Sequence, residues 1–118
     1  MKRILIVDDD KDLLYGLTAL LTNKGYKIKT IEDGRQTQWI TKDFTPDIIL
    51  LDLHLNHSDG REICFQLKRD FRTSHIPILM ISGDSEAKDI MNECPADAFM
   101  AKPLSLISLY NKLEAMTA

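Results

Sequence analysis

Short runs of apolar residues recur along the chain, and longer stretches with helical spacing of their apolar residues separate them. The clearest run follows Asp47, where four consecutive apolar residues precede Asp52. Such a run is typical of a strand buried on both faces, as in a parallel sheet that helices cover. Together with other apolar runs and an alternating stretch, it predicts strands at 4–7, 26–31, 46–52, 76–81 and 98–100.

Helices are expected between these strands, because apolar residues there recur three or four positions apart. Asp9 or Asp10 can cap the first helix, and Gly25 ends it in the usual position. The second is expected at 35–43, the third after Gly60, a short one at 85–93 and the last at 104–116. The expected core contacts of the first three helices are Leu13, Leu14, Leu17, Leu20 and Leu21; Trp39, Ile40 and Phe44; and Ile63, Cys64, Leu67 and Phe71.

Five β/α units in strict alternation predict a three-layer α/β domain with parallel strands and right-handed crossovers. At 118 residues with 44% hydrophobic content, the chain is expected to form one domain, 1–118, around a single core. The alternation alone fixes neither the strand order nor which small doubly wound fold is formed.

Composition narrows the possible functions. A net charge of −3 gives no electrostatic footprint for nucleic acid, so we expect no direct DNA or RNA binding. The first apolar run ends at Asp8, too soon for a signal peptide, and no run approaches the length of a membrane span. We therefore expect a cytoplasmic protein without membrane contact, in which Cys64 and Cys94 are reduced core residues.

Polar residues stand at the ends of four expected strands. Asp8 and Asp9 end the first, Asp52 the third and Ser82 the fourth, and Lys102 follows the fifth. Each alone has a simpler explanation, as a helix N-terminus, a loop hydroxyl or a surface charge. Ligands bind at this edge of open α/β sheets, however, and three carboxylates there would repel unless a divalent cation joined them. An acidic pocket with Mg²⁺, a lysine and a hydroxyl is typical of phosphoryl transfer.

Five motifs together carry a family resemblance. They occupy residues 4–10, 46–52, 59–60, 78–82 and 96–103. In this order and spacing the chain resembles the receiver domain of two-component response regulators along essentially its whole length. The resemblance implies the CheY-like, flavodoxin-like fold, a doubly wound five-stranded parallel sheet of order 2-1-3-4-5.

The resemblance also implies a phosphorelay function. Asp52 would be the phosphoacceptor, taking a phosphoryl group from a sensor histidine kinase, a phosphotransfer protein or a small phosphodonor. Asp8, Asp9 and Asp52 would hold Mg²⁺ together with the backbone carbonyl of His54. A protein with this role assists its own phosphorylation and turns over no external substrate, so we do not expect an enzyme.

The remaining implied roles concern the phosphoryl group and the output. Lys102 would pair with the phosphoryl oxygens, Ser82 would hydrogen-bond them, and Phe99 would be the aromatic switch. A cis peptide bond is implied at Lys102–Pro103. The helix at 85–93, the strand at 98–100 and the last helix would form the output face for a downstream effector protein. We also expect residues 84–94 to become ordered on phosphorylation.

Other readings stay open at this point. A haloacid-dehalogenase-like phosphatase would use Asp8 and Asp10, Ser82, and an acidic motif at Asp84 and Asp89. The order argues against it, since that motif should follow the lysine strand, and 118 residues is short for such an enzyme. A pseudo-receiver would be a purely structural docking module. A zinc site at His54 and His57 lacks a suitable third ligand nearby.

Overall fold

The computed structural model describes residues 1–83 and 94–118. Its centre is a five-stranded sheet of order β2-β1-β3-β4-β5, in which all neighbouring strands are parallel. The strands are β1 (Arg3–Val7), β2 (Lys27–Ile31), β3 (Ile48–Asp52), β4 (Ile78–Ser82) and β5 (Ala98–Ala101). All five predicted strands are confirmed, and so is the doubly wound order implied by the resemblance.

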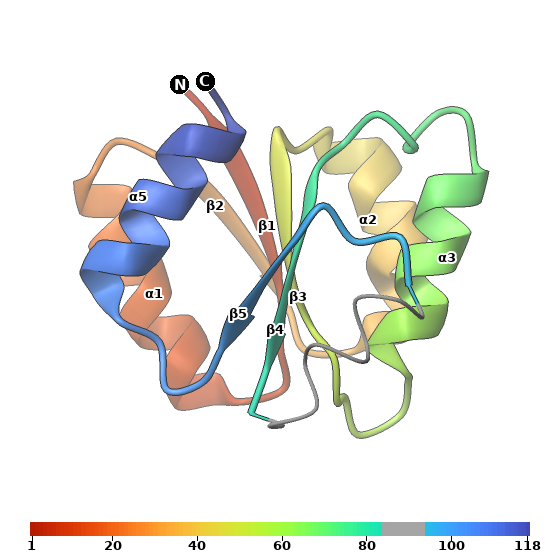
Figure 1. The fold of residues 1–118 in the computed structure, drawn as a ribbon, viewed down its shortest axis with the longest axis horizontal. Coiled ribbons are helices and arrows are strands. Elements are labelled where there is room, and N and C mark those ends of the chain that lie inside the picture. Colours follow the sequence, from red (N-terminus) through yellow and green to blue (C-terminus); the bar gives the residue numbers. More distant parts are fainter. Residues whose placement is uncertain (84–93) are drawn as a thin grey trace.

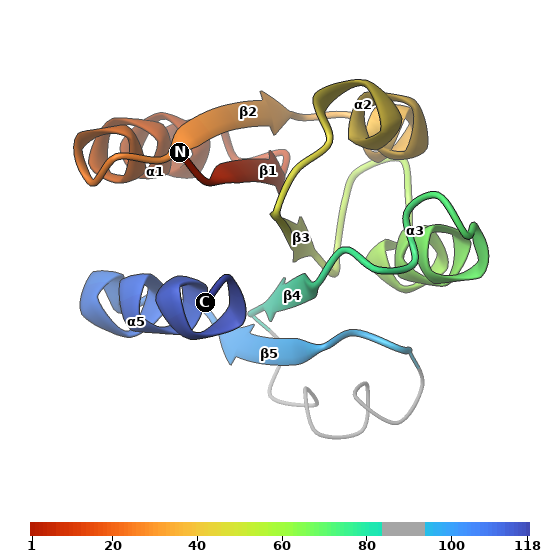
Figure 2. The same ribbon diagram turned by 90° about the horizontal axis from the view of Figure 1, so that it is seen from above.

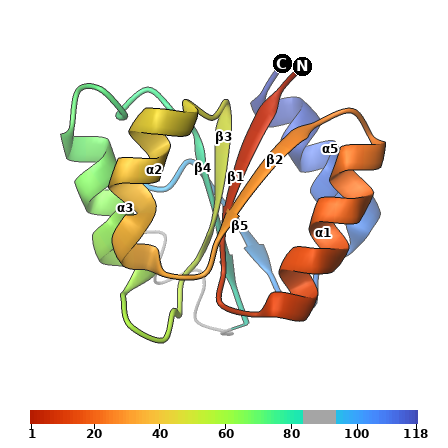
Figure 3. The same cartoon turned by 180° about the vertical axis from the view of Figure 1, so that it is seen from behind.

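Helices cover both faces of this sheet (Figures 1, 2 and 3). They are α1 (Lys11–Asn23), α2 (Thr37–Phe44), α3 (Gly60–Arg69) and α5 (Leu106–Met116), and a 3-10 turn, η1 (Gly34–Gln36), leads into α2. α1 and α5 pack on one face, and α2 and α3 on the other. The helix expected at 85–93, and nearly all of the segment 84–94, fall outside the described residues. Within the described ranges, no helix is long and apolar enough to cross a bilayer.

The central strand β3 is buried along its whole length. Successive side chains of a strand point to opposite faces of the sheet. Accordingly, Ile49 and Leu51 join the core beneath α2 and α3, whereas Ile48 and Leu50 join the core beneath α1 and α5. A strand buried on both faces lies in the interior of the sheet, and its direction brings Asp52 to the carboxyl edge.

Two of the predicted helix ends are confirmed in detail. The Asp10 carboxylate caps α1 by accepting hydrogen bonds from the N–H groups of Asp12 and Leu13, at 3.1 and 3.2 Å. Gly25 follows the helix with a φ of +98°, which an L side chain rarely adopts. Cys64 and Cys94 are free and buried in the core beneath α2 and α3, as predicted.

Two predicted core contacts are wrong. Trp39 is 70% exposed, because α2 buries Thr37, Ile40 and Thr41 instead. Its inward face includes polar threonines, and the Thr37 hydroxyl is satisfied by donating to the Gly34 carbonyl at 2.7 Å. Phe71 is 87% exposed, because α3 ends at Arg69 and no longer directs the following side chains inward.

The start of α3 approaches β3 very closely. The Gly60 N–H donates to the Leu53 carbonyl at 2.9 Å. A Cβ built on Gly60 would collide with the Asp52 carbonyl oxygen and would lie 2.8 Å from the Leu53 Cα. These are backbone atoms that cannot rotate away, so the position requires glycine.

We therefore expect Gly60→Ala to lower the free energy of unfolding by about 2 kcal/mol, the usual cost of forcing extra atoms into a packed site. The matched control is Gly16→Ala in the middle of α1, where a Cβ would meet nothing within 4 Å. That change should raise the free energy of unfolding by about 0.5–1 kcal/mol, because alanine is the better helix former. Urea denaturation of both variants measures the difference, and equal effects would contradict the close approach.

Candidate functional site

Three carboxylates gather at the carboxyl edge of the sheet. Asp8 and Asp9 follow β1, and Asp52 is the last residue of the neighbouring β3. One oxygen from each lies within 4.8 Å of the others. Asp8 is 2% exposed and Asp52 6% exposed, whereas Asp9 is half-buried. The expected convergence of these residues is therefore observed.

Backbone N–H groups orient all three side chains. Asp8 Oδ1 accepts a hydrogen bond from the Asp10 N–H at 2.9 Å. Asp9 Oδ2 accepts one from the Asn56 N–H at 2.8 Å. Asp52 Oδ1 accepts one from the His54 N–H at 3.2 Å. The carboxylates are thus held in place while keeping further lone pairs for another ligand.

Lys102 brings a positive charge to the same pocket. Its Nζ lies 3.0 Å from Asp8 Oδ2 and 3.3 Å from Asp52 Oδ2. The Lys102 N–H donates to the Ser82 carbonyl at 2.8 Å, which ties the residue to the end of β4. Ser82 itself is fully buried. The Lys102–Pro103 peptide bond is cis, as the resemblance implied.

The charges in this pocket do not balance. Burial, and then the nearby Asp8 carboxylate, raise the pKa of Asp52, although Lys102 opposes the shift. Burial would lower the pKa of Lys102, but hydrogen bonds and attraction from Asp8 and Asp52 outweigh it and raise that pKa. One ammonium group among three carboxylates leaves an excess of negative charge, which is the condition for binding a cation.

The carboxylate cluster fits a magnesium ion. Mg²⁺ takes oxygen ligands at about 2.1 Å, so oxygens on opposite sides of the ion lie about 4.2 Å apart. The oxygens of Asp8, Asp9 and Asp52 lie within 4.8 Å of one another, so a small inward movement of these side chains would bring all three to one ion. In the described ranges these three are the residues whose carboxylate, imidazole or thiolate atoms group in this way.

The loop after Asp52 closes over the cluster. His54 forms an isolated antiparallel bridge with Asp59, and the Asn56 N–H contacts Asp9. The contribution of Asn56 was missed at the sequence level, because a backbone N–H leaves no trace in residue type. The His54 and Asn56 side chains are exposed on this loop.

Phe99 lies on β5, one strand beyond Ser82. It is half-buried and packs against the core beneath α2 and α3. In the sheet register it pairs with Met80, and Ser82 pairs with Ala101. Phe99 and the acidic pocket are therefore linked through two adjacent, hydrogen-bonded strands.

Comparison with known proteins identifies the family. Residues 4–114 match the family model of the response regulator receiver domain. The chain belongs to this family. Among curated relatives, the DNA-binding dual master transcriptional regulator RpaA of Synechocystis is 33% identical over 118 residues, which cover 98% of this chain and 49% of that protein. Response regulator PleD of Caulobacter vibrioides is 35% identical over 117 residues, covering 98% of this chain and 26% of that protein. The receiver chain spans about half or less of these relatives.

Solved structures agree on the fold. A putative response regulator from Chloroflexus aurantiacus superposes with a TM-score of 0.91 at 28% identity, covering 98% of this chain and 97% of that one. The receiver domain of a Pseudomonas aeruginosa sensor histidine kinase, with magnesium coordinated in its active site cleft, gives 0.89 at 21% identity, covering 98% and 97%. Membership of the receiver family decides against the haloacid-dehalogenase-like alternative.

The raised pKa of Asp52 has a consequence for stability. The Asp52 carboxyl binds its proton more tightly in the folded protein than in the unfolded chain. Above the folded-state pKa, the buried negative charge therefore lowers the free energy of unfolding. Below the unfolded-state pKa, Asp52 is protonated in both states and this penalty is absent. Replacement by Asp52→Asn should therefore raise the free energy of unfolding at pH 7. The gain should disappear as pH falls through the folded pKa towards the ordinary carboxyl value.

Urea denaturation across this pH range measures the effect, with Asp10→Asn as a control that removes an exposed charge and retains a good helix cap. A less stable Asp52→Asn protein at pH 7 would mean that pairing with Lys102 outweighs burial.

Proposed function

We propose that the protein receives a phosphoryl group on the Asp52 carboxylate from a phosphohistidine of a sensor histidine kinase or phosphotransfer protein. The observation that carries this proposal is the position of Asp52. Its carboxylate groups with those of Asp8 and Asp9 on the neighbouring strand, and its Oδ2 lies 3.3 Å from the Lys102 ammonium. A phosphoryl group on its oxygen would have two cationic partners in reach, the Lys102 ammonium and a divalent cation held by the carboxylates.

The transfer balances as a simple displacement. An Asp52 carboxylate oxygen attacks phosphorus, the phosphorus–nitrogen bond of the donor breaks, and the imidazole nitrogen keeps the electron pair and takes up a proton. Mg²⁺ held by Asp8, Asp9, Asp52 and the His54 carbonyl would neutralise charge developing on the phosphoryl oxygens. Asp52 attacks as a carboxylate, so the charged form that burial disfavours is the reactive one.

Two further residues would hold the product. The Lys102 ammonium, which now bridges Asp8 and Asp52, would pair with a phosphoryl oxygen after transfer. Ser82, buried at the end of β4, would hydrogen-bond another phosphoryl oxygen. These groups act by electrostatic stabilisation at fixed positions, which is the main contribution of proteins to phosphoryl transfer.

The signal would leave through β5 and α5. A shift of Ser82 towards the phosphoryl group would be passed to Phe99 on the neighbouring strand, and from there to the surface that a downstream effector protein contacts. RpaA is named as DNA-binding and is about twice as long as this chain. We therefore assign phosphoacceptance to the receiver itself, and DNA contact to whatever effector responds to it.

The central test is phosphorylation. Incubation with Mg²⁺ and acetyl phosphate or phosphoramidate should add one phosphoryl group by intact mass, and Asp52→Asn should abolish the addition. Asp43→Asn removes an exposed carboxylate on α2 and should be labelled normally. Labelling of Asp52→Asn at the wild-type level would refute the assignment, and unlabelled wild-type protein would favour the pseudo-receiver.

A second test concerns the metal. Asp9→Asn should weaken Mg²⁺ binding by about tenfold or more, because it removes one carboxylate of the cluster. Asp10→Asn removes the neighbouring charge, which caps α1 and is not in the cluster, and should leave Mg²⁺ affinity nearly unchanged.

Isothermal titration with MgCl₂ compares the two variants. Stabilisation of the fold by added MgCl₂ gives an independent readout, since an ion that binds only the native state raises its stability by mass action. Identical affinities for both variants would exclude Asp9 as a ligand.

A further inference from the structure

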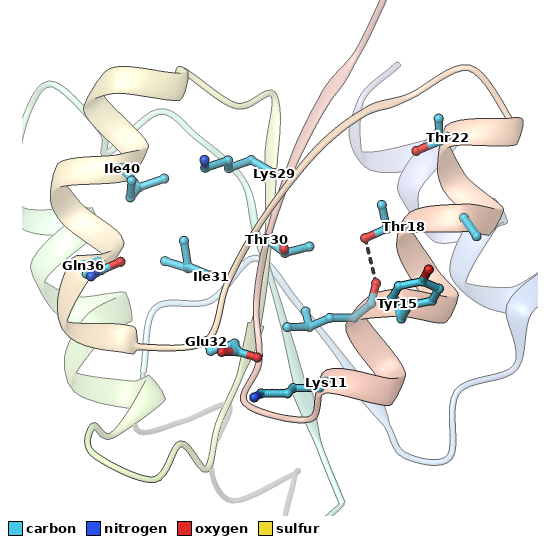
Figure 4. Close-up of a pocket in the computed structure, with 12 residues that line it drawn as sticks. Lys11, Tyr15, Thr18, Thr22, Lys29, Thr30, Ile31, Glu32, Gln36 and Ile40 are labelled. Carbon is cyan, nitrogen blue, oxygen red and sulfur yellow. Dashed lines mark hydrogen bonds between the residues drawn. The ribbon is translucent and has the colours of Figure 1, made fainter.

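A groove runs along the outer edge of the sheet, over β2 and between α1 and α2 (Figure 4). Its volume is about 1000 Å³. Its floor is formed by residues 29–32, and its walls by residues of α1 and by Gln36 and Ile40 on the other side. The proposed phosphoryl chemistry uses none of these residues.

The backbone of the floor is open on its outer side. In a parallel strand, the N–H and C=O of one residue point to the same side, and the next residue points to the other. The Lys27 N–H donates to the Lys2 carbonyl, and the Ile31 carbonyl accepts from Asp8, so odd-numbered residues face β1. Ile28 and Thr30 therefore direct their N–H and C=O groups outwards. In the part of the chain that the structure describes, no strand pairs with this side.

Two large aromatic side chains are exposed on the helices α1 and α2 beside this edge. Tyr15 lines the α1 wall and is 83% exposed. Trp39 is 70% exposed and directly precedes Ile40, the residue of α2 that lines the groove. Exposed tyrosine and tryptophan are enriched at protein interfaces, where they supply large contact areas.

The charges of β2 favour an acidic binding partner. Lys27 and Lys29 are both exposed, and they alternate with Ile28 and Thr30. Lys29 points towards α2 and Thr30 towards α1 (Figure 4). Lys11 and Glu32 both line the groove and carry opposite charges. Antiparallel pairing of two copies through β2 would bring lysines opposite lysines, which disfavours a second copy of this chain.

We propose that this groove binds an extended acidic segment of a partner protein, which adds to the sheet as a strand beside β2. The segment would exchange backbone hydrogen bonds with Ile28 and Thr30. Its acidic side chains, at every second position, would face Lys27 and Lys29. The intervening apolar side chains would lie towards α1 and Tyr15. At about 3.3 Å per residue, a partner strand of about five residues matches β2.

A synthetic peptide of alternating glutamate and valine, about seven residues long, is the probe. Trp39 is the single tryptophan of the chain and is adjacent to Ile40 of the groove, so its fluorescence is a local reporter of binding. We expect a saturable blue shift of its emission as the indole leaves water. In ¹⁵N-labelled protein, the amide shifts of Ile28 and Thr30 should be among the largest. A lysine–valine peptide should not bind.

Two variants test the two halves of the proposal. Thr30→Pro removes an outward N–H that the pairing with β1 does not use, and edge strands tolerate proline at such positions. It should abolish binding of the glutamate–valine peptide. The double variant Lys27→Glu and Lys29→Glu keeps the backbone and should weaken binding about tenfold or more. Lys112→Glu, an exposed charge change on α5, should leave binding unchanged.

Circular dichroism and acetyl phosphate labelling of each variant establish that the fold and the acidic pocket are intact, which separates this proposal from the proposed phosphoacceptance. If Thr30→Pro fails to fold, the double lysine variant decides. Undiminished binding by the double variant would overturn the proposal, as would amide shifts confined to other elements or no binding at all. Equal affinity for polyglutamate or a DNA oligonucleotide would also overturn it, because charge alone would then explain binding. Self-association through β2, lost in the double variant, would replace the partner segment with a second copy.

Discussion

The site of this domain depends on one electrostatic constraint, the burial of two carboxylates with a single ammonium group beside them. Lys102 follows β5 at the edge of the sheet, and its ammonium group reaches both Asp8 and Asp52. It can do so only because β1 and β3 are neighbours and β4 and β5 follow in order. The apolar cores on both faces hold that strand order. Hydrophobic burial therefore keeps together carboxylates that would otherwise repel one another.

Throughout the molecule, apolar residues set the geometry and polar residues at the strand ends supply the chemistry. The interior strands are apolar along most of their length and set the geometry, whereas each chemical group stands at the end of a strand or just after it. Each of the three carboxylates accepts a hydrogen bond from a backbone N–H group, which orients it without a further side chain. A sheet edge built in this way can hold a charged site without weakening the packing beneath it.

Sequence reasoning predicted the strands, the fold class and the convergence of acidic residues, because continuous apolar runs and strand-end carboxylates depend on local pattern. It failed for Trp39, since apolar character alone suggested a core contact, whereas the face of α2 is set by Thr37, Ile40 and Thr41. It failed for Phe71 because helix ends are poorly marked in sequence. The Asn56 contact with Asp9 could not be predicted from the sequence, because only the folded loop brings the Asn56 N–H to the carboxylate.

Residues 53–60 form a ring that closes on itself, because the Gly60 N–H returns to the Leu53 carbonyl and His54 pairs with Asp59. Every closing contact uses backbone atoms, apart from the space that Gly60 must leave empty. The ring therefore constrains the number of its residues far more than their identity. An insertion or deletion here would rotate α3 against β3, whereas exchange of the exposed His57 or Asn56 side chain would leave the ring intact. During evolution, this loop should therefore change by substitution while its length stays constant.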